Sequence, residues 1–401
     1  MDLITVKEAE DIIQLYVKDY GSEEVPYTMS SGRVLAEHLY ADRDLPPFNR
    51  ATVDGIAIRA TAGAVGSKSF TIIGTQAAGE PPIAITTERA CVEVMTGAAL
   101  DPSLDAVIRY EDISVENGIA TIKGAIDIKA GMNLHVRGKD KRKGEMVAAA
   151  PRLICPALIG LAASIGKTTL TVKKLPRVAI ISTGDEMVPP ESAPTPFQLR
   201  RSNGIVMQSV LQRYMIQADT YHLNDDIGLI RTTLAGLLKD YDVLLLSGGV
   251  SMGKFDYVPQ ALQELGVAKR FHKIRQRPGK PFWFGTHHES VVFAFPGNPV
   301  SVFMCLNRYF VPWLERSLKM PQSSGRMAVL GRDIEFKPPL QYFIQVQLET
   351  DKEGVIVATP FDSNGSGDFS NLIYANAFME LPLERTQFRK GELFKVWQYK
   401  N

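Results

Sequence analysis

A short apolar run that passes directly into glycines constrains the fold of this chain more than any other feature. Residues 243–246 read VLLL, as expected of a strand that is buried on both faces. Ser247, Gly248 and Gly249 follow at once. Because no side chain blocks the approach, glycines after a buried strand let backbone N–H groups close in on an anion. The segment therefore predicts either a phosphate-binding loop or a tight turn.

Asp256 follows in the same loop, after Ser251. A carboxylate beside a bound phosphate would repel it, and a divalent cation held between the two groups is the usual physical solution. In the other interpretation, Asp256 caps a helix over residues 257–265. The segment alone leaves both interpretations open.

Strands and helices alternate in the region around this loop, over residues 176–320. Strands are expected at residues 178–182, 243–246 and 291–295, and helices at residues 204–217, 227–239, 257–265 and 299–318. The alternation predicts a three-layer α/β domain, with a mostly parallel sheet between helices. Ligands of such domains bind at the carboxyl ends of the strands. The loops there, and the segment before the last strand, contain Glu186, Gly248, Gly249, Arg277, Lys280, Pro296, Gly297, Asn298 and Pro299.

The rest of the chain is predicted to form three further parts. A helix is expected at residues 6–19, begun by the capping-box pair Thr5 and Glu8 and ended by Gly21. Residues 147–174 are expected to pack beside that helix. The predicted domains are an N-terminal domain (residues 1–45 and 143–175), an inserted β-rich domain (residues 46–142), the α/β domain (residues 176–320) and a C-terminal β-barrel (residues 326–401).

The composition narrows the classes of function. A formal net charge of +1 gives no electrostatic case for binding nucleic acid or an anionic membrane. Cys91, Cys155 and Cys305 are far apart in apolar surroundings, which predicts buried, reduced thiols rather than disulfides or a zinc site. The chain shows no secretory signal and no apolar run long enough to cross a bilayer, so a cytoplasmic protein is expected.

The motifs of this chain together resemble those of one enzyme family. In chain order they are PPF (46–48), DG (54–55), MTGA (95–98), RGKD (137–140), TGDE (183–186), DD (225–226), SGGVSMG (247–253), RPGKP (277–281) and PGNPVS (296–301). Their types and order resemble the molybdopterin molybdenumtransferase family, which includes the matching domains of gephyrin and of the plant molybdenum insertase. The resemblance extends over nearly the whole chain.

The resemblance implies a fold and an activity. Members of this family form elongated four-part subunits that pair as homodimers with a shared active site. They take adenylylated molybdopterin and molybdate, release AMP with the help of magnesium, and leave molybdenum on the dithiolene sulfurs. A molybdopterin adenylyltransferase is the partner protein that this activity suggests. The alternative functions are a molybdopterin adenylyltransferase, which needs little beyond the α/β domain, and a non-catalytic scaffold, which needs none of the acids.

The resemblance also assigns roles to individual residues. The expected catalytic residues are Asp256, Glu186, Asp54 and Asp140, and the expected metal ligands are Asp256, Glu186, Asp225 and Asp226. The expected substrate-binding residues are Ser247, Gly248, Gly249, Ser251, Arg277, Lys280, Pro296, Gly297, Asn298, Pro299 and Thr96. Three plainer interpretations stay open: Asp225 or Asp226 as a helix cap, Asp140 as surface charge, and Thr96 as the partner of a turn backbone.

Four residues depart from the family's pattern. Asn49 stands where Asp is common, Ile56 where Tyr is common, Lys139 where Glu is common, and Arg201 where an acid is common. These changes bear on the contacts expected in the inserted domain and beside Asn203. The motifs of the α/β domain are intact.

Overall fold

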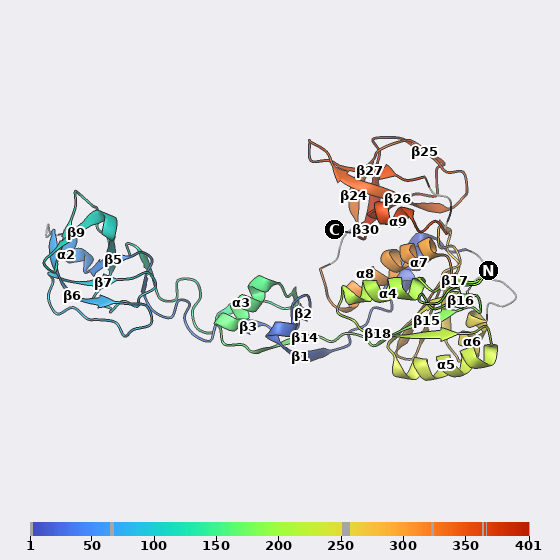
Figure 1. Ribbon diagram of the computed structural model, residues 1–401, viewed down its shortest axis with the longest axis horizontal. Helices are drawn as coiled ribbons and strands as arrows, with labels where there is room; N and C mark the ends of the chain where they lie inside the picture. Colours follow the sequence, from blue (N-terminus) through green and yellow to red (C-terminus); the bar gives the residue numbers. More distant parts are fainter. Residues whose placement is uncertain are drawn as a thin grey trace.

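The computed structural model describes an elongated molecule. It covers residues 3–64, 68–250, 257–321, 325–362, 365 and 367–400. The inserted β-rich domain lies at one end of the molecule, and a smaller region of short strands connects it to the other end (Figure 1). The α/β domain and the C-terminal barrel lie side by side at that other end. This arrangement confirms the predicted fold class, a multidomain α/β chain with a C-terminal barrel.

The first helix begins as predicted, but it is shorter than predicted and packs against a different part of the chain. Helix α1 (Val6–Gln14) has the capping box of Thr5 and Glu8, with both reciprocal hydrogen bonds present. It ends at Gln14, well before Gly21. Its buried residues Val6, Ala9 and Ile13 join the core of the α/β domain. The expectation that α1 packs beside residues 147–174 was therefore wrong, because the buried face of the helix meets the α/β domain instead.

The connecting region is built from segments on both sides of the inserted domain. Its strands pair β1 (Ser22–Pro26) with β14 (Thr169–Lys173), β2 (Val34–Leu35) with β13 (Arg152–Leu153), and β3 (Leu39–Tyr40) with β12 (Met146–Ala148). The 3-10 turn η1 (Tyr27–Met29) and helix α3 (Pro156–Ser164) pack against them. Because the chain leaves and returns at neighbouring strands, the segment between them projects as one unit. Cys155, just before α3, is exposed, so the prediction that it is buried was wrong.

The inserted domain is a six-stranded sheet. Its order is β8 (Ala106–Arg109), β5 (Gly55–Ile58), β7 (Ala90–Val94), β6 (Ser69–Gln76), β10 (Ile119–Ile122) and β9 (Ile113–Glu116). Helix α2 (Ala60–Ala64), the 3-10 turn η2 (Tyr110–Asp112) and the strand pair β4 (Arg50–Ala51) and β11 (Leu134–His135) complete it. Asn117 and Gly118 take positive φ angles of 48° and 76° in the hairpin between β9 and β10, as that turn requires.

The α/β domain has a six-stranded sheet with apolar clusters on both faces. Its order is β18 (Ala218–Leu223), β15 (Val178–Thr183), β19 (Val243–Ser247), β23 (Ser290–Phe295), β22 (Trp283–His287) and β20 (Ala268–His272). The first four strands are parallel and the last two are antiparallel to their neighbours. Val243 and Leu245 belong to the cluster on one face and Leu244 and Leu246 to the cluster on the other, which confirms a strand buried on both sides.

Helices cover this sheet, and their ends differ in places from the predicted ones. They are α4 (Asn203–Gln212), α5 (Ile227–Asp240), α6 (Val258–Glu264), α7 (Pro299–Cys305) and α8 (Val311–Ser317). The expected extension of α4 to residue 217 is wrong, because Met215 takes a φ of +58° and its side chain is exposed. A π turn (Leu306–Phe310) joins α7 to α8 just before Pro312, whose missing N–H a regular helix could not accommodate.

The C-terminal region closes into a five-stranded barrel. The ring runs through β26 (Gln341–Thr350), β27 (Ile356–Pro360), β24 (Arg326–Leu330), β30 (Leu393–Gln398) and β28 (Ala377–Leu381), which pairs with β26 again. Strands β25 (Ile334–Glu335) and β29 (Gln387–Phe388) and helix α9 (Asn371–Tyr374) lie outside the ring. Strand β21 (Gln276–Arg277) of the α/β domain pairs with β26, so a candidate site loop is tied to the barrel. No helix among the described residues is long and apolar enough to span a membrane.

Candidate active site

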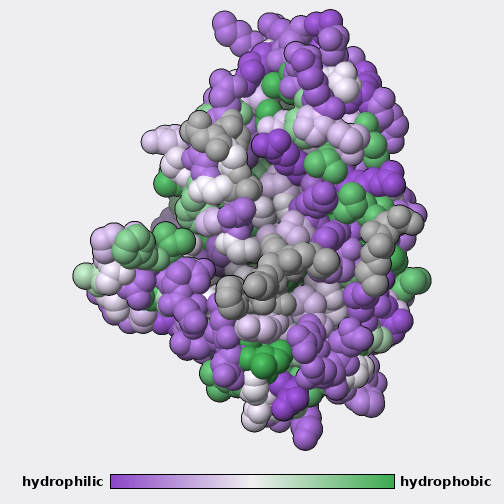
Figure 2. All heavy atoms as spheres, turned by 90° about the vertical axis from the view of Figure 1, so that its right-hand side faces the viewer, coloured by the Kyte–Doolittle hydropathy of each residue, from purple (hydrophilic) through white to green (hydrophobic). Residues whose placement is uncertain are grey.

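The three predicted loops meet at the carboxyl edge of the α/β sheet. Strands β15, β19 and β23 are neighbours, with Ser182 opposite Ser247 and Ser247 opposite Phe295. The segments that follow these strand ends therefore lie next to one another, as the sequence predicted. Strands β16 (Met187–Val188) and β17 (Leu199–Arg200), which continue the first loop, lie at this end of the molecule (Figure 1). In Figure 2 the face at this end is mostly hydrophilic, and its hydrophobic residues are scattered.

The two glycines after β19 are fixed in a left-handed backbone conformation. Gly248 and Gly249 have φ angles of +93° and +65°. A Cβ atom on Gly249 would lie 2.8 Å from Thr183 Oγ1 and 2.9 Å from Val258 Cγ2. A side chain would therefore be strained by the backbone and blocked by both neighbours. Gly249 therefore fits between the end of β15 and the start of α6 only because it has no side chain.

Thr183, at the end of β15, is a site residue that the prediction missed. It is 5% exposed, and its Oγ1 has no hydrogen-bond partner among the described residues. A buried hydroxyl without a partner carries a desolvation cost, and at a ligand site the ligand can satisfy it. The signal in the sequence was its place at the head of the TGDE motif.

Asn203 joins two of the loops. Its Nδ2 donates to Ser247 Oγ at 2.8 Å and to the carbonyl oxygen of Gly297 at 2.7 Å, and the residue is 9% exposed. Ser247 is buried as well, so it contributes to the site by holding the loop. Asn203 is the first residue of α4. In the sequence it was singled out only because it lies close to Arg201, which departs from the family's pattern.

The last loop carries four predicted substrate-binding residues. Pro296 is buried, Pro299 is partly buried, and Gly297 and Asn298 are exposed. Asn298 stands at the N-cap position of α7, and Pro299 is the first residue of that helix. The loop therefore presents two exposed residues at the sheet edge between two proline anchors.

Of the three predicted acids at this edge, Glu186 is exposed, Asp225 is half-buried, and Asp226 caps a helix. Asp226 Oδ1 accepts from the backbone N–H of Leu229 at 2.7 Å, which makes Asp226 the N-cap of α5. Asp225 donates its backbone N–H to Asp185 Oδ1 at 3.2 Å. Glu186 is exposed, and its carboxylate folds back to within 2.6 Å of where a Gly184 side chain would begin. The loop at β15 and the loop after β18 thus bring Glu186 and Asp225 to the same corner of the sheet.

The predicted cations sit on a loop that a buried network holds in place. Arg277 and Lys280 are exposed. Behind them, the fully buried Gln276 donates from Nε2 to the Gly279 carbonyl at 3.0 Å and accepts from the Tyr309 hydroxyl. Gln276 and Tyr309 carry no motif signal, because Gln276 stands just before the RPGKP motif and Tyr309 comes from a distant part of the chain.

Two predicted residues, Ser251 and Asp256, lie outside the described residues. The residue before them, Val250, is buried, and its carbonyl accepts from His272 Nε2 at 2.9 Å. A carbonyl oxygen can only accept, so His272 carries its proton on Nε2. Among the described residues, no group of three or more His, Cys, Asp or Glu side chains is placed to hold a metal ion.

The inserted domain holds a second group of predicted site residues. Asp54 Oδ1 accepts from the Thr96 backbone N–H at 2.6 Å and from Thr96 Oγ1 at 2.7 Å. These bonds, the hydroxyl bond first, lower the pKa of the Asp54 carboxyl below its ordinary value. Asp140 Oδ1 lies 2.9 Å from His135 Nε2, a contact the sequence did not predict.

The departures in this domain have structural consequences. Asn49 Oδ1 accepts from the backbone N–H of Arg137 at 2.9 Å, so Asn49 holds the RGKD segment without a charge. Ile56 is fully buried in β5. Lys139 is exposed. Both described groups of site residues are thus intact, but one chain keeps them in domains at opposite ends of the molecule (Figure 1).

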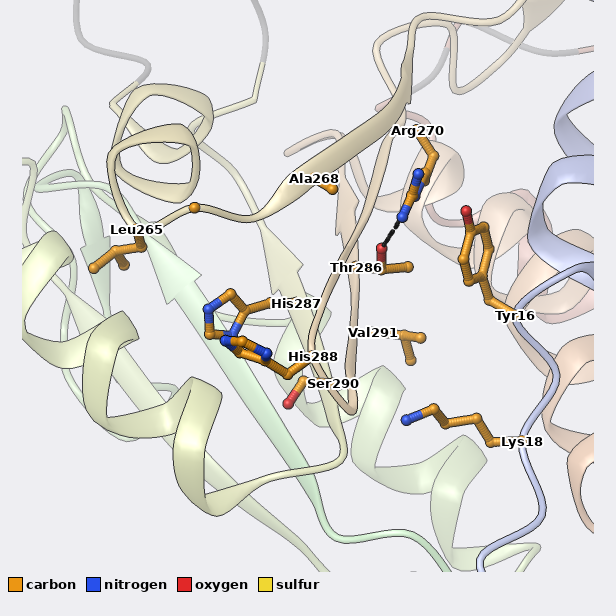
Figure 3. A pocket seen from close by; sticks show the side chains of 11 residues that line it. Tyr16, Lys18, Leu265, Ala268, Arg270, Thr286, His287, His288, Ser290 and Val291 are labelled. Atoms are coloured by element: carbon orange, nitrogen blue, oxygen red, sulfur yellow. Dashed lines mark hydrogen bonds between the residues drawn. The ribbon is translucent and has the colours of Figure 1, made fainter.

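A separate cavity of about 440 Å³ lies at the opposite edge of the sheet, where β23 begins at Ser290. Its cations already have partners. Arg270 donates to Thr286 Oγ1 at 2.9 Å (Figure 3) and lies 4.7 Å from the centre of the Tyr16 ring, and Lys18 pairs with Glu289. The rings of His287 and His288 lie on the other side of the hairpin from Arg270 and Lys18 (Figure 3). Because these groups do not converge, the cavity is a poorer candidate than the carboxyl edge.

Three family models match successive parts of the chain. The model described as "MoeA N-terminal region (domain I and II)" matches residues 4–166. The one described as "Probable molybdopterin binding domain" matches residues 179–316, which contain the carboxyl-edge loops. The one described as "MoeA C-terminal region (domain IV)" matches residues 327–399.

Relatives are similar to the chain over its whole length. A molybdopterin molybdenumtransferase from Synechocystis sp. is 37% identical over 400 residues, covering 99% of this chain and 100% of the relative. One from Bacillus subtilis is 28% identical and covers 98% of this chain and 93% of the relative. The crystal structure of a molybdopterin biosynthesis moea protein from Pyrococcus horikosii is 28% identical, with a TM-score of 0.86 and coverage of 100% of both chains.

Proposed function

Because this chain belongs to the molybdopterin molybdenumtransferase family and is an enzyme of molybdenum cofactor biosynthesis, we propose that its substrate is adenylylated molybdopterin and that AMP is a product. The enzyme inserts molybdenum into molybdopterin. The proposal adds the form in which molybdopterin is bound and the metal ion that assists the reaction.

The proposed turnover consists of two steps, each balanced in atoms and electrons. Water attacks one phosphorus atom of the phosphoanhydride, the bond from that phosphorus to the bridging oxygen breaks, and AMP and molybdopterin, each ending in a phosphate, are released. Molybdate then exchanges one oxo group for the two sulfurs of the dithiolene; that oxygen leaves as water with the two thiol protons. Molybdenum stays in its highest oxidation state, so neither step needs a reductant or an oxidant.

The observation that carries the proposal is the glycine loop after β19. Its left-handed glycines carry no side chain beside the hydroxyl of Thr183, which has no partner among the described residues, and Arg277 and Lys280 are exposed on a further loop. The Gly248 N–H already donates to the Phe295 carbonyl at 3.3 Å, so the O–H of Thr183, the backbone after Gly248 and the two cations are what this surface offers to the phosphates of a nucleotide-like group. In this proposal the loop after β19 binds the phosphates and the Thr183 hydroxyl donates a hydrogen bond to a phosphate oxygen. Arg277 and Lys280 offset the negative charge of the phosphates as the anhydride is cleaved.

We propose magnesium as the metal that assists. The donor set fits it: Glu186 and Asp225 are carboxylates at one corner, and magnesium takes one or two carboxylates and completes its shell with phosphates and water. Glu186 and Asp225 would hold the ion, together with Asp256 from outside the described residues. When bound, magnesium would neutralise charge on the phosphates. Asp226 is already occupied as the cap of α5.

The test is turnover of adenylylated molybdopterin by the whole enzyme. AMP release and molybdenum bound to the pterin are measured together, with molybdate present or absent and with magnesium added or chelated. The proposal expects both products to rise together with molybdate, and AMP release to need magnesium. Molybdenum insertion into free molybdopterin at the same rate, with adenylylated substrate left intact, would reject it.

A further inference from the structure

Asp140 receives a hydrogen bond from a histidine that belongs to no motif. His135 Nε2 lies 2.9 Å from Asp140 Oδ1, and His135 Nδ1 lies 3.1 Å from a guanidinium nitrogen of Arg50. A guanidinium can only donate, so Nδ1 must be the accepting nitrogen and Nε2 the one that carries the proton. Arg50 therefore fixes the tautomer in which His135 donates to the carboxylate.

The contact is built into the base of the inserted domain. His135 ends strand β11 and pairs directly opposite Arg50 on β4. On its other side β4 meets the Thr96 loop, since Gly97 donates its N–H to the Ala51 carbonyl at 2.8 Å. The His135–Asp140 contact and the Asp54–Thr96 contact thus border the same two-residue strand.

Both acids are held in the same manner. Asp54 uses Oδ1 to accept both Thr96 donors, and Asp140 uses Oδ1 to accept from His135. Within the described part of the chain, no hydrogen bond reaches Oδ2 of either residue. Each carboxylate therefore has one oxygen fixed by the protein and one oxygen left for a ligand.

We propose that His135 is a positioning residue for Asp140, with its tautomer set by Arg50, and that it acts in molybdenum transfer through this carboxylate alone. The role of Asp140 rests on the proposed function and on a second copy of the chain, whose α/β domain must bring the reacting groups to this domain. The side chain of Asp140 is 56% exposed and that of His135 is 23% exposed, so without the imidazole the carboxylate would be free to change rotamer. Orienting one oxygen aims the other at the reacting groups.

The backbone around Asp140 does not depend on His135. The backbone N–H of Asp140 donates to the Leu45 carbonyl at 2.9 Å, and that of Gly138 donates to the Pro46 carbonyl at 2.9 Å. Replacing the imidazole should therefore release the carboxylate and leave the loop in place. This separation makes the proposal testable by substitution.

The first test reads the tautomer without any activity. The full chain is labelled with ¹⁵N at histidine, and the His135 signals are assigned by their loss in His135→Gln. We expect an unprotonated Nδ1 and a protonated Nε2 at neutral pH, and a mixture of tautomers in Arg50→Met. The opposite tautomer, or no change in Arg50→Met, would overturn the proposal.

The second test couples His135 to Asp140. When molybdenum insertion is measured together with AMP release, His135→Ala should lower kcat for both roughly tenfold, as expected when a hydrogen bond to a charged group is lost, and should leave KM nearly unchanged. His135→Gln keeps a donor and should recover most of the rate. In an Asp140→Asn background, His135→Ala should cause no further loss.

Two results of the second test would contradict the proposal. Full activity of His135→Ala would do so, as would losses from His135→Ala and Asp140→Asn that multiply. Thermal unfolding of each variant controls for damage to the fold. A wild-type enzyme that releases no AMP would reject the proposed function instead, and the tautomer experiment would still decide how His135 and Arg50 are arranged.

Discussion

At the scale of single residues, the candidate site contains polar atoms that the fold holds in place but leaves without a hydrogen-bond partner among the described residues. Thr183 Oγ1 is buried without a described partner at the carboxyl edge of the sheet. Asp54 and Asp140 each have one oxygen fixed by donors. A fold tolerates such groups where a ligand completes them. Two substitutions separate this interpretation from a purely structural one.

The first substitution is Thr183→Val, which keeps the shape and removes the hydroxyl. Because the hydroxyl makes no described hydrogen bond, stability should stay the same or rise by up to about 1 kcal/mol. The lost donor should raise KM for adenylylated molybdopterin roughly threefold to tenfold. Thermal unfolding and AMP-release kinetics measure the two effects.

Thr286→Val is the matched control for Thr183→Val. Thr286 is also buried near a strand end, but its Oγ1 accepts from Arg270 at the opposite edge of the sheet. This variant should lose stability, by about 1 kcal/mol, and keep its KM. The interpretation fails if the two variants behave alike.

The second substitution, Thr96→Val, tests the Asp54 carboxylate. Thr96 lowers the pKa of Asp54 below its ordinary value of 3.8, so Asp54 stays ionised as the solution becomes more acidic. The stabilisation is present above the ordinary value and is lost as the pH falls through the lowered pKa. Thr96→Val keeps the backbone donor, so the pKa should rise part of the way back. Carboxyl NMR titration of Asp54 measures this; a pKa that does not rise in Thr96→Val would disprove the assignment.

At the scale of elements, the sequence predicted best where the signal was local. The VLLL run, the Thr5–Glu8 capping box and the glycines of the β19 loop depend on neighbours in the chain, and all three appear as expected. The turn at Met215 and the packing of α1 on the α/β core depend on tertiary contacts, which periodicity does not contain.

For the candidate site too, local signals were predicted correctly and tertiary contacts were not. The motif residues at the strand ends came together, because parallel neighbouring strands end at one edge. Gln276 and His135 were missed, because each is defined by a partner elsewhere in the chain or by a turn of the loop. The two contacts of Asn203 were not predicted either, because Ser247 and Gly297 lie far away in the chain. The exposure of Cys155 was missed because apolar neighbours in sequence do not fix which face of an element is buried.

The β19 loop gives a prediction at the scale of an element. Gly249→Ala places a Cβ against Thr183 Oγ1 and Val258 Cγ2 at a φ of +65°. Strain and clash together should lower stability by about 1–3 kcal/mol and displace the loop, so substrate binding should be lost. Denaturant unfolding and direct binding of adenylylated molybdopterin measure this.

Gly266→Ala is the control for the strain alone. Gly266 has a φ of +76°, and a Cβ there would meet nothing within 4 Å. It should cost about 1–2 kcal/mol and leave binding intact. Equal binding by Gly249→Ala and Gly266→Ala would show that the β19 loop does not hold the substrate.

At the scale of the whole molecule, the two groups of site residues are separated within one chain. Asp54, Thr96 and Asp140 belong to the inserted domain, and the β19 loop lies in the α/β domain at the other end (Figure 1). If both groups serve one reaction, a second copy of the chain must bring them together. A closed two-fold dimer is the simplest assembly that does so, and it creates two identical sites.

The most direct test of this account mixes two inactive variants, Asp54→Ala and Asp256→Ala, under conditions that exchange subunits. In a mixed dimer with shared sites, one site carries both substitutions and the other carries neither. Statistical exchange of equal amounts makes half of the dimers mixed, so AMP release should recover to about a quarter of the wild-type rate. Exchange is verified by mass spectrometry of differently tagged chains. Verified exchange with no activity above that of the two parents would contradict the shared site.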